Sequence, residues 1–279
     1  MNELLLVVIG SRGRLRSTLL EDLVAELDKV VFVEPVRIGA ADRLECVVNE
    51  RLSEVICGKR LSDSELGCAI AHRNARVAAE NALVGNESIE WSLFVEDDAD
   101  LDLRTFNQIF SELDQLKVKG PVIANYDYRN QSPFFRSKAR KQLSVLGASR
   151  HLLPGAACYS LNREGIRELN QFSHIPIDCV ADWPLYFTRL KLFVSNQTWV
   201  NETTGPSTIG ERSNQNVRSR FAMHVRQVAN IRELSHLNLV PIRGVIQHLV
   251  ITPLIRDILG RIWMHRSNSF ELSEGQRRS

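Results

Sequence analysis

The sequence predicts an α/β fold in which a mostly parallel sheet is flanked by helices and followed by a basic helical extension. Residues 4–9 form a continuous apolar run, as expected for a buried parallel strand. Apolar residues with helical spacing over 19–27 come next, and residues 30–36 are expected to form a second strand. This strand–helix–strand order is typical of a doubly wound sheet, which binds ligands at the carboxyl ends of its strands.

The composition is that of a globular protein. The chain has 279 residues, of which 44% are hydrophobic and 24% are charged. The N-terminal apolar run lacks the basic start of a signal peptide, so we expect it to be the first strand. No apolar run reaches the roughly 18 residues that a membrane span needs.

Charge is distributed unevenly and divides the chain into two domains. Residues 1–211 carry 24 Lys and Arg against 29 Asp and Glu, whereas residues 212–266 carry nine Arg and two acids. We therefore expect one α/β domain over residues 1–211 and a basic amphipathic extension over residues 212–279. Two interpretations of the extension stay open: an anionic membrane surface binds it, or it forms short helices that pack on the sheet. No nucleic acid is expected as a partner.

Five cysteines are scattered singly along the chain, without a CxxC pair. A cluster of zinc-binding cysteines is therefore not expected, and the odd count favours reduced thiols in a reducing compartment.

The segment that follows residue 61 is the most informative. Ser62-x-x-Glu65 is a capping box that begins a helix running to about residue 82, and Thr18-x-x-Glu21 is a similar motif. At about 100° per residue, Glu65, His72 and Arg76 fall on one stripe of the later helix. His72 is either functional or a structural hydrogen-bonding residue. A nucleophilic role for Cys68 has less support, because no Asn or Asp partner is indicated.

Three carboxylates, Glu96, Asp97 and Asp98, directly follow an apolar strand over residues 93–95. Adjacent carboxylates repel one another, and a divalent cation such as Mg²⁺ or Mn²⁺ commonly compensates them and can bridge the oxygens of a diphosphate. The alternative is a solvated acidic turn that caps a helix over 103–113, a role that Asp100 and Asp102 fit better.

Two other segments are candidate sites. The loop after the first strand contains Gly10, Ser11, Arg12 and Arg14, and its backbone N–H groups could bind an anion, although it is neither GxGxxG nor a P-loop. The alternative is a solvated turn. Asp178 and Asp182 precede a Trp and could provide a general base beside a stacked sugar, or they could cap the helix expected over 180–189. Further strands are expected over 121–125 and 156–161, with a helix over 163–170.

The order of these motifs resembles glycosyltransferase family 25, the lipopolysaccharide galactosyltransferase-like enzymes. The resemblance covers roughly residues 4–212 and depends on order and spacing more than on any single motif. It departs from the family pattern at Gly10, at Ala71 before His72, and in the position of the second loop arginine. Its motifs are VVI followed by Arg12 and Arg14, LS..ELGC..AH over 61–72, FVEDDA over 94–99, GAACY with REG over 155–165, and Asp178-x-x-x-Asp182.

The resemblance implies a GT-A-like, Rossmann-type fold and a glycosyltransferase that moves a hexose, galactose, from a UDP-sugar to a lipopolysaccharide or surface polysaccharide. It implies Mn²⁺ or Mg²⁺ at Glu96, Asp97 and Asp98, donor binding at Gly10, Ser11, Arg12 and Arg14, and catalytic roles for Asp182, Asp178, His72 and Glu65. It also implies a lipid-linked acceptor and a cytoplasmic active site, and the basic segment over 212–266 predicts peripheral attachment to the inner face of the inner membrane. Two alternatives are a metal-dependent nucleotidyl or phosphoryl transferase and a non-catalytic carbohydrate- or membrane-binding descendant.

Overall fold

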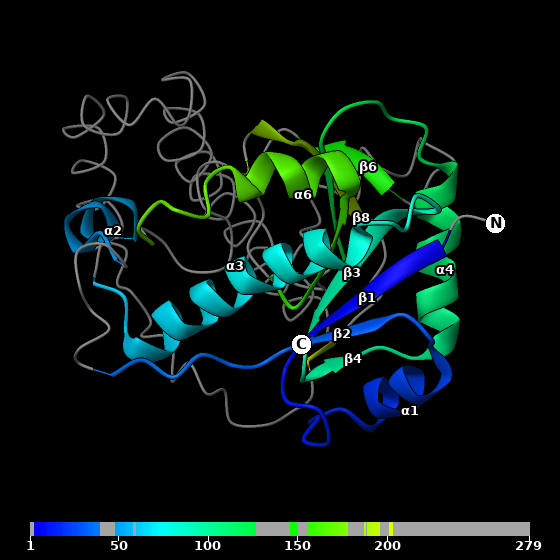
Figure 1. Cartoon of the computed structure of the whole chain (residues 1–279), viewed down its shortest axis with the longest axis horizontal. Coiled ribbons are helices and arrows are strands. Elements are labelled where there is room, and N and C mark those ends of the chain that lie inside the picture. The colour runs from blue at the N-terminus through cyan, green and yellow to red at the C-terminus, as the bar shows by residue number, and fades with distance from the viewer. Residues whose placement is uncertain are drawn as a thin grey trace, which may run out of the picture. The chain divides into compact units, whose positions relative to one another are not determined.

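A computed structural model describes residues 3–39, 48–57, 60–126, 146–149, 156–177, 187, 189–195 and 201–202 (Figure 1). The chain divides into two compact units, Met1–Asn214 and Gln215–Ser279, and all described residues belong to the first. The expected basic extension over 212–279 and the segment that carries Asp178 and Asp182 therefore lie outside the described residues.

Among the described residues, seven strands form one sheet in the order β2-β1-β3-β7-β5-β8-β6, and two short strands pair separately. In chain order the strands are β1 Glu3–Ile9, β2 Val30–Val33, β3 Ile89–Glu96, β4 Ala99–Asp100, β5 Val122–Asn125, β6 Leu146–Ser149, β7 Cys158–Asn162, β8 Lys191–Ser195 and β9 Asn201–Glu202. The helices are α1 Thr18–Glu26, α2 Glu50–Cys57, α3 Asp63–Leu83, α4 Leu103–Gln115 and α6 Arg163–Asn170.

The sheet is mixed, which confirms the α/β class, and five of its seven strands run in the same direction, as expected for a mostly parallel sheet, whereas β6 and β7 are reversed. β1 is parallel to β2 and β3, and β5 is parallel to β8. β7 is antiparallel to both of its neighbours, and β6 is antiparallel to β8. An apolar run predicts a buried strand but not its direction, because direction depends on the connections at its two ends.

Both faces of the sheet are covered, so its central strands are apolar on both sides. The side chains of β1 alternate between the two layers: Leu5, Val7 and Ile9 pack with α3 and α6, whereas Leu4, Leu6 and Val8 pack with α1 and α4. This explains why β1 has a continuous apolar run and not an alternating pattern. None of the described helices is long and apolar enough to cross a membrane.

Helix caps define where the helices begin. The capping box of α3 is confirmed, because Ser62 N donates to Glu65 Oε2 at 2.9 Å and Glu65 N donates to Ser62 Oγ at 3.2 Å. The expected box at Thr18 is wrong, since Ser17 is the N-cap of α1 and accepts from Leu20 N. Asp102 caps α4, as expected from the sequence.

Candidate functional site

The candidate site lies where β1 and β3 end side by side. The two strands are parallel, with Ile9 opposite Glu96, so the loop after β1 meets the carboxylates after β3. Backbone bonds hold the two segments together: Asp97 N donates to Ile9 O at 3.1 Å, and Arg16 N donates to Asp97 O at 2.9 Å. Two segments that the sequence predicted to be functional therefore lie together at the carboxyl ends of β1 and β3.

Gly10 allows this close approach. A Cβ at Gly10 would lie 2.4 Å from Asp97 Cβ, so any larger residue would displace the Asp97 side chain. The backbone N–H of Gly10 donates to Val33 O at 3.0 Å. This corrects the expectation that this N–H takes part in binding an anion: Gly10 makes room for Asp97, and its donor is already used.

Arg16 connects the loop to the carboxylates. Its guanidinium donates to Asp97 Oδ1 from Nε at 3.0 Å and from Nη2 at 2.6 Å, and Nη2 lies 3.3 Å from Asp98 Oδ2. Partial burial acts to lower the pKa of Arg16, but the hydrogen bond to Asp97 and the nearby carboxylate charges outweigh it and raise this pKa. Asp97 and Asp98 thus already share a cationic group.

The other loop residues point to different neighbours. Ser11 Oγ donates to the carboxylate of Glu34, and the Arg12 guanidinium lies 5.6 Å from the ring centroid of Phe32 on β2. Arg14 is exposed, and its backbone N–H closes a turn onto Ser11 O at 3.1 Å. The loop therefore presents Arg12 and Arg14 at the surface beside the β1–β3 edge, whereas Arg16 contacts the acids directly.

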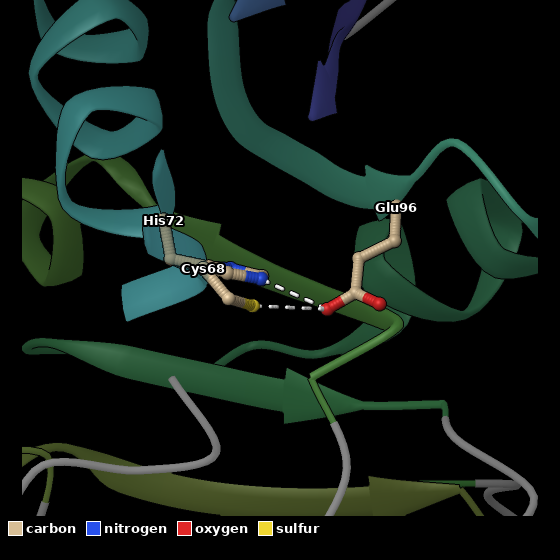
Figure 2. A group of neighbouring side chains, drawn as sticks. All are labelled: Cys68, His72 and Glu96. Carbon is tan, nitrogen blue, oxygen red and sulfur yellow. Dashed lines mark hydrogen bonds and ion pairs between the residues drawn. The ribbon is translucent and has the colours of Figure 1, made fainter. Parts of the chain in front are cut away.

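Glu96 points toward Cys68 and His72 of α3, as Figure 2 shows. Its Oε1 lies 3.0 Å from His72 Nε2 and 3.9 Å from Cys68 Sγ. Glu96 is the last residue of β3, whereas Asp97 and Asp98 lie in the turn that follows it. The expected three-carboxylate metal site is thus divided: Glu96 belongs to a group with Cys68 and His72, while Asp97 and Asp98 belong to the Arg16 cluster.

Tyr159 of β7 fixes the orientation of His72. The hydroxyl of Tyr159 lies 3.1 Å from His72 Nδ1, and the two rings stack with centroids 5.7 Å apart. Tyr159 also stacks on Phe94, its partner across the β3–β7 pair. Burial raises the pKa of Tyr159 far above the physiological range, so its hydroxyl keeps its proton. His72, whose side chain is 2% exposed, thus has a defined neighbour on each ring nitrogen.

The predicted stripe on α3 is confirmed, since Glu65, His72 and Arg76 are all buried. Glu65 nevertheless uses its carboxylate in the capping box and does not belong to the group of Cys68, His72 and Glu96. Asp178 and Asp182 lie outside the described residues.

Sequence reasoning missed Arg16 and Tyr159. Arg16 is the third arginine of the same loop, whereas the family motif includes only Arg12 and Arg14. Tyr159 lies within an expected strand, and only the pairing of β7 with β3 brings it to His72. In comparisons with known proteins, no protein-family model and no curated protein matches this chain.

Proposed function

We propose that the protein is a metal-dependent glycosyltransferase that moves galactose from UDP-galactose to a lipopolysaccharide or surface polysaccharide acceptor. The observation that supports this proposal is the contact of Arg16 with both Asp97 and Asp98 at the carboxyl edge of β1 and β3. In open α/β sheets ligands bind at this edge. A complex of a divalent cation with a diphosphate matches both kinds of charge in this cluster. The carboxylates can bind the cation, and the guanidinium can bind the phosphates.

The carboxylates fit a hard divalent cation. Asp97 and Asp98 provide oxygen ligands, and their side chains are 16% and 19% exposed. The positively charged guanidinium of Arg16 already contacts both carboxylates. Mn²⁺ or Mg²⁺ at these oxygens would neutralise the negative charge that develops on the leaving UDP. In this proposal Asp98 and Asp97 hold the cation, and Glu96 does not, because it belongs to the group with Cys68 and His72.

The chain's other residues have roles around that centre. Arg16 moves from the carboxylates to the donor's phosphates, and Arg12 and Arg14 bind the outer part of the donor. His72 and Glu65 lie on the buried stripe of α3, and Asp182, with Asp178 as the second choice, deprotonates the acceptor hydroxyl. The GT-A-like character of the fold is part of this same proposal.

We also propose that the enzyme is cytoplasmic, with residues 212–266 attaching it to the anionic inner face of the inner membrane at about 1 kcal/mol per nearby Arg. If deletion of residues 240–279 leaves sedimentation with anionic vesicles unchanged, this attachment is wrong.

The deciding experiment measures UDP release from a panel of nucleotide sugars with and without Mn²⁺ and a saccharide acceptor. We expect metal-dependent release from UDP-galactose, which Asp98→Asn abolishes and Asp22→Asn leaves unchanged, because Asp22 is exposed on α1. Release of phosphate or pyrophosphate in place of UDP would indicate a phosphoryl or nucleotidyl transferase. Full activity of Asp98→Asn at saturating Mn²⁺ would contradict the assigned cation site.

A further inference from the structure

We infer that Cys68, His72 and Glu96 form a second metal site, which binds a divalent ion of the zinc class. Sγ of Cys68, a ring nitrogen of His72 and a carboxylate oxygen of Glu96 all lie within 4.8 Å of one another. Thiolate, imidazole and carboxylate are the three ligand types that Zn²⁺ accepts in proteins. Figure 2 shows the Cys68 and His72 side chains directed from α3 at the same carboxylate.

Two of the three distances between the ligand atoms are close to those of a tetrahedral zinc site, and the third is within 4.8 Å. Standard zinc–ligand bonds place a carboxylate oxygen about 3.4 Å from an imidazole nitrogen and about 3.6 Å from a thiolate sulfur. The corresponding distances from Glu96 Oε1 are 3.0 Å to His72 Nε2 and 3.9 Å to Cys68 Sγ. Both can reach the ideal values by shifts of less than about half an ångström, which side-chain rotation provides.

Local structure already positions the ligands. Cys68 and His72 are four residues apart on α3, so their side chains lie one above the other on the same face. Glu96 approaches from the end of β3. A histidine that binds zinc through Nε2 places a proton on Nδ1 and needs an acceptor there. The hydroxyl oxygen of Tyr159, 3.1 Å from Nδ1, provides that acceptor.

A nucleophilic cysteine is the competing interpretation, and the contacts of His72 oppose it. A catalytic dyad needs a histidine nitrogen directed at the thiol. Here Nε2 faces Glu96 and Nδ1 faces Tyr159, while the contact shown for the Cys68 thiol is with the Glu96 carboxylate. Three ligands that converge on one point suit a cation better than an acyl or phosphoryl acceptor.

This site is separate from the proposed catalytic cation. Its ligands lie on the α3 face of β3, whereas Asp97 and Asp98 contact Arg16 in the loop after β1. The two sites also differ in chemistry, because sulfur and nitrogen select a softer ion than two carboxylates do. Glu96 is 21% exposed, so water or substrate can reach a fourth coordination position.

Cobalt binding tests the inference without any activity assay. The full-length reduced protein is stripped of metal and titrated with Co²⁺. We expect one equivalent to give the near-ultraviolet thiolate-to-cobalt band and the visible bands of a tetrahedral ion, with Zn²⁺ displacing it. Binding should release the thiol proton and so weaken as pH falls.

Variants distinguish cobalt binding at this site from binding by other thiols and carboxylates of the chain. Cys68→Ser, which replaces one atom, should abolish the thiolate band and weaken binding at least about 100-fold, and Glu96→Gln should weaken it in the same sense. Cys158→Ala and Asp98→Asn should keep the full band. Circular dichroism and thermal melting check that each variant is folded. An absent band in the parent protein, or an unchanged band in folded Cys68→Ser, overturns the inference while leaving the glycosyltransferase proposal intact.

Discussion

Glu112 makes stability depend on pH in a direction that can be worked out from the structure. It lies on α4 beside the buried Leu113, and desolvation raises its pKa from 4.5 to about 7. Among the described residues, no hydrogen-bond partner is found for its Oε2. Between about pH 4.5 and 7 the folded protein holds this proton more firmly than the unfolded chain. Stability therefore falls as pH rises through that window, and the full cost is present above pH 7.

Glu112→Gln removes the ionisation and keeps the size of the side chain. The difference between 4.5 and about 7 corresponds to about 3 kcal/mol. We discount this to about 1 kcal/mol because the side chain is partly exposed and water screens the charge. The free energy of unfolding of Glu112→Gln is compared with that of the parent protein at each pH. This difference should be about 1 kcal/mol more favourable to the variant at pH 8 than at pH 5.

Urea unfolding at pH 5, 6, 7 and 8, followed by tryptophan fluorescence, measures this difference. Glu26→Gln, an exposed change near the end of α1, is the matched control and should give a difference that is nearly constant with pH. A gain from Glu112→Gln that does not grow between pH 5 and pH 8 would refute the reasoning.

Three further predictions concern packing, capping and the candidate site. Gly67→Ala should lower the free energy of unfolding by about 2 kcal/mol, measured in urea, because the added Cβ would lie 2.3 Å from Val36 O and backbone cannot easily move. Arg163→Met should cost about 3 kcal/mol in the same assay, because the guanidinium donates to three carbonyls at 2.6 to 3.0 Å (Leu83, Asn86 and Ile89). Arg16→Gln should bind Mn²⁺ more tightly in paramagnetic resonance titrations, since a competing cation is lost, yet release UDP at least about tenfold more slowly. Weaker Mn²⁺ binding by folded Arg16→Gln would count against the shared cluster.

The helices and the apolar strands could be predicted because their signals are local. α3 and α6 begin where the capping box and the Arg163 segment indicated, and β1 and β5 match their apolar runs to within one residue. α2, β6 and β8 were not predicted, since short elements carry little periodicity.

The division of the candidate site could not be read from the same patterns. The sequence presents Glu96, Asp97 and Asp98 as one group, but β3 ends at Glu96, and Asp97 and Asp98 lie in the turn that follows it. Cys68 and His72 share a helix face that spacing does predict. Spacing does not predict that Glu96 joins them, because it is the packing of α3 on the sheet beside the end of β3 that brings Glu96 to Cys68 and His72.

The position of β7 has a consequence for how the chain folds as it is made. β7 lies between β3 and β5, yet Cys158–Asn162 leaves the ribosome long after β3 does. At about 5–20 residues per second, β3 waits roughly 3–13 seconds with one edge unpaired. That edge belongs to the apolar segment from Trp91 to Val95, and an open apolar edge is a template for pairing with other chains. Nascent chains that end before Cys158 are therefore expected to aggregate, and slower translation between β3 and β7 should increase the demand for chaperones.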